Sequence, residues 1–104
     1  MEFKLSRPIK THKGGDTTDT LTLKEPTART FVTHGNPFQI KQTDGAAEYI
    51  FDNKASMGFL ASMTGHNDIE LSAIAAKDFY PLRYAMAHVI LVGLGENPTP
   101  PSAT

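Results

Sequence analysis

The sequence predicts a single α+β domain, in which an N-terminal β-hairpin packs against a small bundle of about three to four helices. Apolar and polar residues alternate near the N-terminus, and the spacing of apolar residues becomes helical from about residue 46. Prolines gather after residue 96, which is typical of a disordered segment. Because 104 residues suit one core, we expect residues 1–96 to form the domain and residues 97–104 to form a flexible tail.

The predicted hairpin joins two segments whose apolar residues occupy alternate positions, residues 2–9 and residues 20–24. Two glycines and an aspartate at positions 14–16 indicate the turn between them. Pro8 has no backbone donor and suits the end or the edge of its strand. Two strands alone are marginally stable in water, so we expect helices to cover their apolar face. The residues expected on that face are Phe3, Leu5, Leu21 and Leu23.

A short helix is predicted after the hairpin, from Thr27, a suitable N-cap, through Val32. The histidine, glycine, asparagine and proline at positions 34–37 end it. Residues 38–45 show no strong period, and we expect a surface loop there.

The remaining helices follow in close succession. The main helix is predicted over residues 46–63, with Asp44 as its cap, and a short helix is predicted over residues 67–75. The last helix is expected to begin at Asp78, which places Pro81 in its first turn, where a missing N–H costs little. Glycines at positions 93 and 95 end it.

The composition argues against several classes of protein. There are no cysteines, which excludes disulfides and metal–thiolate sites, and the net charge of -1 does not favour a nucleic-acid or membrane-surface protein. The N-terminal residues lack the apolar core of a signal peptide, and the longest apolar stretch is too short to span a bilayer. We therefore expect a soluble intracellular protein that binds neither nucleic acid nor membranes.

No catalytic, cofactor or metal site is predicted. The four histidines are His12, His34, His66 and His88, and no two have the i, i+3 or i+4 spacing of helical metal ligands. The serines lack the context of a nucleophile elbow, and the glycines at 93 and 95 follow a helix instead of a strand. A small hydrolase with a histidine–carboxylate pair remains an alternative, and it requires two of the histidines to meet an acidic residue in one pocket.

Aromatic and methionine residues are concentrated in the two main predicted helices. A core of this size cannot bury both faces of both helices, so some of these side chains are candidates for an exposed stripe that binds an apolar helix of a partner. A packed core with a few exposed aromatics is the competing interpretation. The residues selected as a partner-binding surface are Phe51, Met57, Tyr80 and Tyr84.

The order of several short motifs resembles the family of phage tail assembly chaperones found in Mu-like phages and prophages. The motifs are Leu-Thr-Leu-Lys-Glu-Pro-Thr at 21–27, Met-Thr-Gly at 63–65, an acidic stretch at 67–71, and Asp-Phe at 78–79 before the last helix. They are short and non-catalytic, and the resemblance covers residues 2–92.

The resemblance implies a chaperone without enzymatic activity that acts in the host bacterial cytoplasm. Such proteins bind the tape measure protein and keep it soluble while the tail tube protein, a further candidate partner, polymerises around it. In this family a ribosomal frameshift often produces a second, longer product. A structural tail or baseplate component that is retained in the virion is the alternative.

Overall fold

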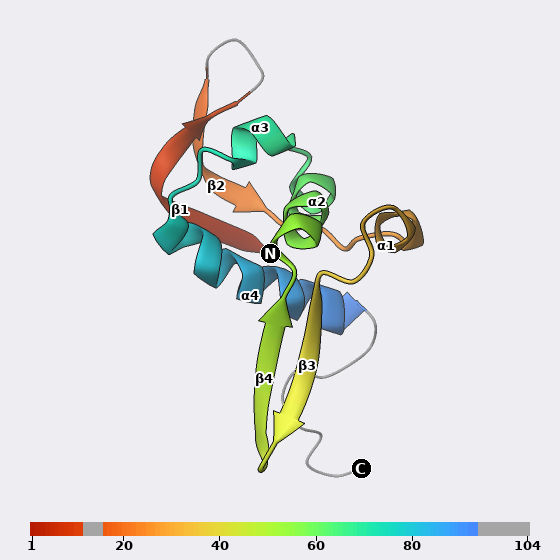
Figure 1. Ribbon diagram of the computed structural model, residues 1–104. Coiled ribbons are helices and arrows are strands. Elements are labelled where there is room, and N and C mark those ends of the chain that lie inside the picture. Colours follow the sequence, from red (N-terminus) through yellow and green to blue (C-terminus); the bar gives the residue numbers. More distant parts are fainter. Residues whose placement is uncertain (12–15, 94–104) are drawn as a thin grey trace.

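The computed structural model describes residues 1–11 and 16–93 and confirms the α+β fold (Figure 1). Its elements are β1 (Glu2–Lys10), β2 (Thr17–Thr22), α1 (Ala28–His34), β3 (Phe38–Thr43), β4 (Ala46–Phe51), α2 (Asn53–Thr64), α3 (Asp68–Leu71) and α4 (Ala76–Gly93). The strands form two separate two-stranded antiparallel sheets, β1–β2 and β3–β4. The tail predicted at residues 97–104 lies outside the described residues.

The N-terminal hairpin has the predicted pairing and the predicted apolar face. Phe3 lies opposite Leu21 across the two strands, and Leu21 and Leu23 are fully or almost fully buried. The register shifts between Lys4 and Ile9, in the stretch that contains Pro8. A proline cannot donate a hydrogen bond to the ladder, so this irregular stretch is a position where it is tolerated.

The core lies between the β1–β2 hairpin and the helices α2, α3 and α4, which cover its apolar face (Figure 1). A backbone hydrogen bond of 3.0 Å from Lys24 N to Met63 O ties the chain after β2 to the end of α2. Burial of these apolar side chains supplies the main driving force for folding. The buried residues of the core are Leu5, Ile9, Leu21, Leu23, Phe59, Leu60, Met63, Leu71, Leu82, Met86, Val89 and Ile90.

Residues 38–51 form a second hairpin, so the loop predicted at 38–45 was wrong, and so was the first part of the helix predicted over 46–63. The cause is the Asp44-Gly45 pair, whose φ angles are 52° and 81°. Two consecutive positive φ angles are typical of a type I′ turn, for which Asp-Gly is a preferred sequence. Asp44 is therefore a turn residue and not a helix cap.

Helix α2 begins at Asn53, seven residues later than predicted. Asp52 is its N-cap: the Ala55 N–H donates to the Asp52 carboxylate over 3.0 Å. Gly65, with φ 79°, ends the helix in the left-handed conformation, as predicted. The short helix predicted after it is present as α3, where Asn67 and Glu70 form a reciprocal capping box.

Helix α4 begins at Ala76, so the prediction that Asp78 caps it was also wrong. Asp78 lies in the first turn, and its carboxylate instead accepts two hydrogen bonds from Ser6 of β1. Pro81 consequently lies inside the helix and not at its start. None of the described helices is long and apolar enough to cross a membrane.

Helix α1 packs on α2 through aromatic contacts and one close approach. The rings of Phe31 and Phe59 meet edge to face at 4.9 Å, and the His34 ring lies over Gly58. A Cβ atom at position 58 would overlap ring atoms of His34. A glycine is therefore needed at this point of α2 as long as His34 keeps its position.

Gly58→Ala is expected to show a strong dependence on His34. In a helix the change normally stabilises by about 0.5–1 kcal/mol, but here the alanine must displace the His34 ring. We expect the gain to appear only in a His34→Ala background, with a coupling of about 1 kcal/mol in a double-mutant cycle measured by urea unfolding. Additive effects of the two substitutions would contradict this close packing.

Candidate functional site

The β3–β4 hairpin, which we call the arm, extends away from the body of the molecule (Figure 1). All residues of the two strands are exposed except Phe38, Tyr49 and Phe51, which are half-buried. These three aromatic residues lie towards the base of the arm. They therefore mark the place where the arm contacts the body.

The aromatic residues of the arm share one face. Phe38 pairs with Phe51 and Ile40 pairs with Tyr49, and such directly opposed residues point to the same side of a hairpin. The rings of Phe38 and Tyr49 stack with their centroids 5.6 Å apart. The opposite face carries more polar pairs, among them Lys41 with Glu48.

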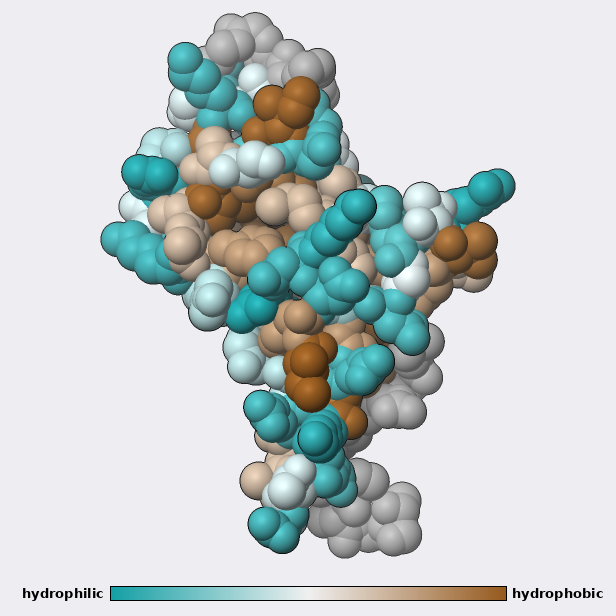
Figure 2. Space-filling view, viewed as in Figure 1, coloured by the Kyte–Doolittle hydropathy of each residue, from teal (hydrophilic) through white to brown (hydrophobic). Residues whose placement is uncertain are grey.

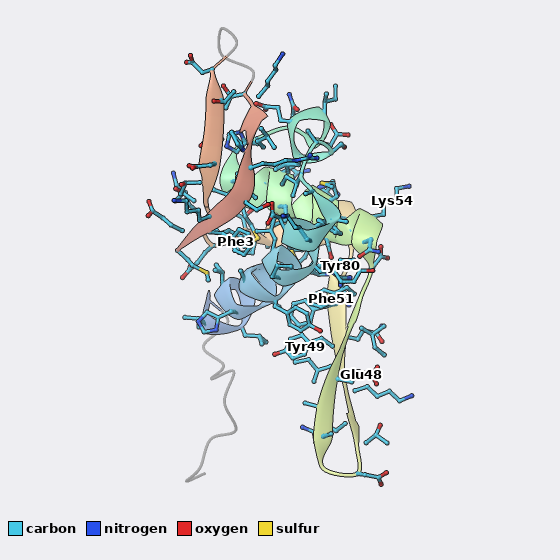
Figure 3. All side chains as sticks on the ribbon, turned by 90° about the vertical axis from the view of Figure 1, so that its left-hand side faces the viewer. Phe3, Glu48, Tyr49, Phe51, Lys54 and Tyr80 are labelled. Atoms are coloured by element: carbon cyan, nitrogen blue, oxygen red, sulfur yellow. The ribbon has the colours of Figure 1, made fainter. Side chains whose placement is uncertain are left out.

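Helix α4 meets this aromatic face through Tyr84, and Tyr80 lies one turn earlier on the same helix. The Tyr84 ring lies edge-on to Phe51, with a centroid distance of 5.0 Å, and lies 5.6 Å from the ring of Tyr49. Figure 3 shows Tyr49 and Phe51 between the arm and α4, with Tyr80 close by on the helix. Aromatic pairs in these geometries add about 0.5–1.5 kcal/mol each beyond their burial.

Arg83 connects α4, the arm and α2. Its guanidinium carbon lies 4.5 Å from the ring centre of Phe51 and 4.2 Å from that of Tyr80, which are cation–π distances. Its Nη1 donates a hydrogen bond of 2.8 Å to the Oδ1 atom of Asn53, the first residue of α2. We call Tyr49, Phe51, Tyr80, Arg83 and Tyr84 the aromatic surface.

Much of this surface is accessible to solvent. Tyr80 is 59% exposed and Tyr84 is 52% exposed, although both are large aromatic residues. Other exposed apolar side chains, such as Val32 and Ile69, lie on α1 and α3, and Figure 2 shows hydrophobic side chains as separate spots among hydrophilic ones. Isolated apolar residues are normal on a protein surface, whereas tyrosine and arginine are residue types that are enriched in protein–protein interfaces.

The structure brings together three of the four residues predicted for partner binding. Phe51, Tyr80 and Tyr84 belong to the aromatic surface, whereas Met57 lines a pocket with residues of α1 and α3. Tyr49 and Arg83 are not among the residues predicted from the sequence for partner binding. The Asp-Gly turn was the signal that could have placed Tyr49 and Phe51 on one face of a strand.

The described residues do not bring two histidines together with a carboxylate. His34 ends α1, His88 lies on α4, and His66 Nδ1 is 3.6 Å from Oε2 of Glu70, four residues further on. Within residues 1–11 and 16–93, no group of three or more histidine, aspartate or glutamate residues could hold a metal ion. His12 lies outside the described residues.

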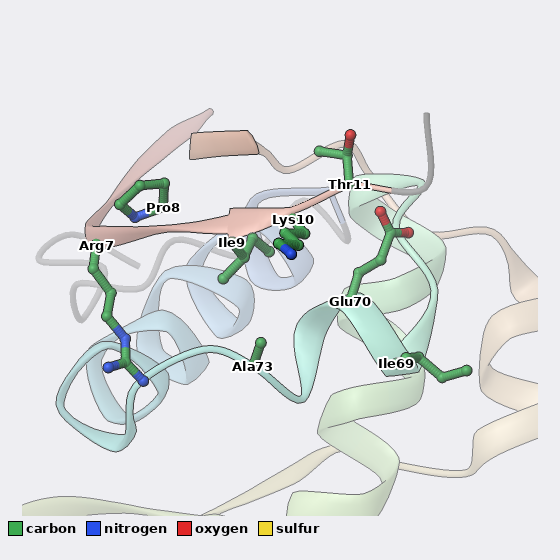
Figure 4. A pocket seen from close by; sticks show the side chains of 8 residues that line it. All are labelled: Arg7, Pro8, Ile9, Lys10, Thr11, Ile69, Glu70 and Ala73. Carbon is green, nitrogen blue, oxygen red and sulfur yellow. The ribbon is translucent and has the colours of Figure 1, made fainter. Parts of the chain in front are cut away.

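A separate pocket lies between β1 and α3 (Figure 4). Its two cationic side chains, Arg7 and Lys10, come from β1, and Glu70 comes from α3. The Glu70 Oε1 atom accepts a hydrogen bond from Asn67 N, so this carboxylate serves the capping box of α3. Glu70 therefore has a structural role at the start of α3, and we take the aromatic surface as the candidate functional site.

Comparisons with protein-family models, with curated proteins and with solved structures found no match to this chain.

Proposed function

We propose that this protein is a phage tail assembly chaperone, which binds the tape measure protein and keeps it soluble while the tail tube assembles. It would act in the host cytoplasm as a soluble binding protein, without catalytic activity and without a cofactor. The resemblance of its short motifs to that family supplies the biological role. The structure supplies a surface that suits it.

The observation that carries the proposal is the exposure of two adjoining tyrosines, Tyr80 and Tyr84, beside the aromatic base of the arm. Tyrosine and arginine are enriched in the residues that dominate binding energy, because they combine apolar area with hydrogen-bonding groups. A long apolar helix in solution exposes a continuous hydrophobic stripe and tends to aggregate. Covering that stripe with tyrosine rings would keep the helix soluble and would still allow release.

Co-expression with the tape measure protein from the same gene neighbourhood tests the proposal. We expect the tape measure protein to become soluble and to co-purify with the chain. Purified virions should lack the chain, since a chaperone is released before the tail is complete. A tape measure protein that remains insoluble and unbound would refute the proposal, and stoichiometric retention in virions would favour a structural tail or baseplate component.

Substitution of the tyrosines should weaken this binding. Tyr84→Ala and Tyr80→Ala are each expected to cost about 2 kcal/mol of binding free energy, or roughly thirtyfold in Kd, as measured by calorimetry with a soluble fragment of the partner. Val32→Ala is the matched control, because Val32 is 82% exposed but lies on α1. Equal losses in all three variants would show that the aromatic surface is not the binding site.

A further inference from the structure

The environment of Arg83 lacks a negative charge. A guanidinium group has five N–H donors and no acceptor. Its Nη1 donates to Asn53, but the buried Nε has no hydrogen-bond acceptor among the described residues. No carboxylate in residues 1–11 or 16–93 lies within ion-pair distance of this guanidinium. Arg83 is therefore a half-buried cation that contacts aromatic rings and an amide, with no carboxylate beside it in the described part of the chain.

The acidic residues near the base of the arm have other neighbours than Arg83. The Asp52 carboxylate accepts the Ala55 N–H as the cap of α2. Glu48 lies opposite Lys41 on the face of the arm that points away from the aromatic residues.

Two further exposed cations, Lys54 and Lys77, lie near the starts of α2 and α4.

We propose that Arg83 binds a carboxylate of the partner: an aspartate or glutamate side chain that borders the apolar stripe of a helix lying on the tyrosines. This inference rests on the proposed function and specifies the chemistry of the partner at that same surface. The helix that binds this surface is therefore apolar along one stripe and carries acidic residues at the edge of that stripe.

Three physical features favour a carboxylate at this point. The planar guanidinium can bind both carboxylate oxygens, which a lysine ammonium cannot do in the same geometry. The rings of Phe51 and Tyr80 hold the guanidinium in place, so less conformational freedom is lost on binding. A docked helix excludes water, which strengthens the ion pair and raises the cost for a helix that leaves Arg83 unpaired.

Two synthetic helical peptides of about 20 residues test the inference on the full chain. Both carry the same leucine stripe, and they differ only in having glutamate or glutamine at the positions that border it. We expect the wild-type chain to bind the glutamate peptide at least about tenfold more tightly in calorimetry. Raising the salt concentration should reduce that preference.

The variants assign the preference to one residue. Arg83→Gln should lose most of the preference for the glutamate peptide, whereas Arg29→Gln, which changes an exposed arginine of α1, should keep it. Arg83→Lys should keep a reduced preference, because it retains the charge but loses the planar group. It also controls for any structural damage caused by the loss of the hydrogen bond to Asn53.

The outcomes separate this inference from the proposed function. Equal affinity of the wild-type chain for the two peptides, including binding of neither, overturns the inference, as does an undiminished preference in Arg83→Gln. Binding of the tape measure protein without any dependence on Arg83 removes the inference and leaves the proposed function. If the chain discriminates between the peptides but does not bind the tape measure protein, the inference stands and the proposed function is removed.

Discussion

Phe59→Ala is expected to lower the free energy of unfolding by about 3–5 kcal/mol. Phe59 is fully buried in the middle of α2 and belongs to the core under the β1–β2 hairpin. Its ring also meets Phe31 edge to face at 4.9 Å. Alanine would remove this contact, the apolar area and the volume that the ring fills.

Urea unfolding followed by circular dichroism measures this effect. Small domains are stable by only about 5–15 kcal/mol, so the alanine variant could be substantially unfolded. Phe59→Leu leaves a smaller cavity and should show a smaller loss with an unchanged denaturant slope. Val32→Ala, on the exposed side of α1, should change the stability by no more than about 0.5 kcal/mol. A loss below about 1 kcal/mol for Phe59→Ala would contradict the central position of this ring.

The elements that were predicted correctly are those in which the residues that the local sequence pattern marks as apolar are also the residues that the structure buries. In the N-terminal hairpin, Leu21 and Leu23 alternate with threonine, and the structure buries both leucines. At Asn67 and Glu70 the capping box is a local arrangement that needs no distant partner. Such elements are determined within a few residues and can be found without a fold.

The arm shows where this reasoning failed. Ala46, Ala47 and Glu48 are good helix formers, and they favoured a helix over residues 46–63. The Asp44-Gly45 turn imposes a hairpin instead, and the aromatic contacts of Tyr49 and Phe51 with Tyr84 hold it against α4. Turn chemistry and tertiary contacts therefore overrode helix propensity. The turn could have been recognised from the sequence, whereas the contact with α4 could not.

The candidate site was also predicted only in part. Tyr80 and Tyr84 were selected because aromatic and methionine residues are too many in the two main predicted helices for all of them to be buried, and the structure exposes both tyrosines. Arg83 could not be selected, because its role depends on three elements meeting: α4, the base of the arm and the start of α2. An arginine in a helical sequence is ordinarily a solvated surface residue.

Asp78→Ala is expected to cost about 2–3 kcal/mol of stability. Asp78 is buried, with only 7% of the residue exposed. Its carboxylate accepts hydrogen bonds from Ser6 N over 3.0 Å and from Ser6 Oγ over 2.8 Å. These bonds join β1 to the first turn of α4 across 72 residues of sequence. Alanine would leave the Ser6 N–H without its acceptor and would also remove a negative charge that is favourable near a helix N-terminus.

Two further variants separate these contributions. Ser6→Ala removes only the hydroxyl donor, so it should cost about 1 kcal/mol. Asp78→Asn should fall between it and Asp78→Ala, because the amide oxygen can still accept from Ser6 but carries no charge. Urea unfolding gives the order of the three losses, and amide hydrogen exchange at Ser6 should be faster in Asp78→Ala. If Ser6→Ala proved as costly as Asp78→Ala, the hydroxyl would be the dominant link between β1 and α4. An unchanged exchange rate at Ser6 would mean that its N–H is protected by something other than this carboxylate.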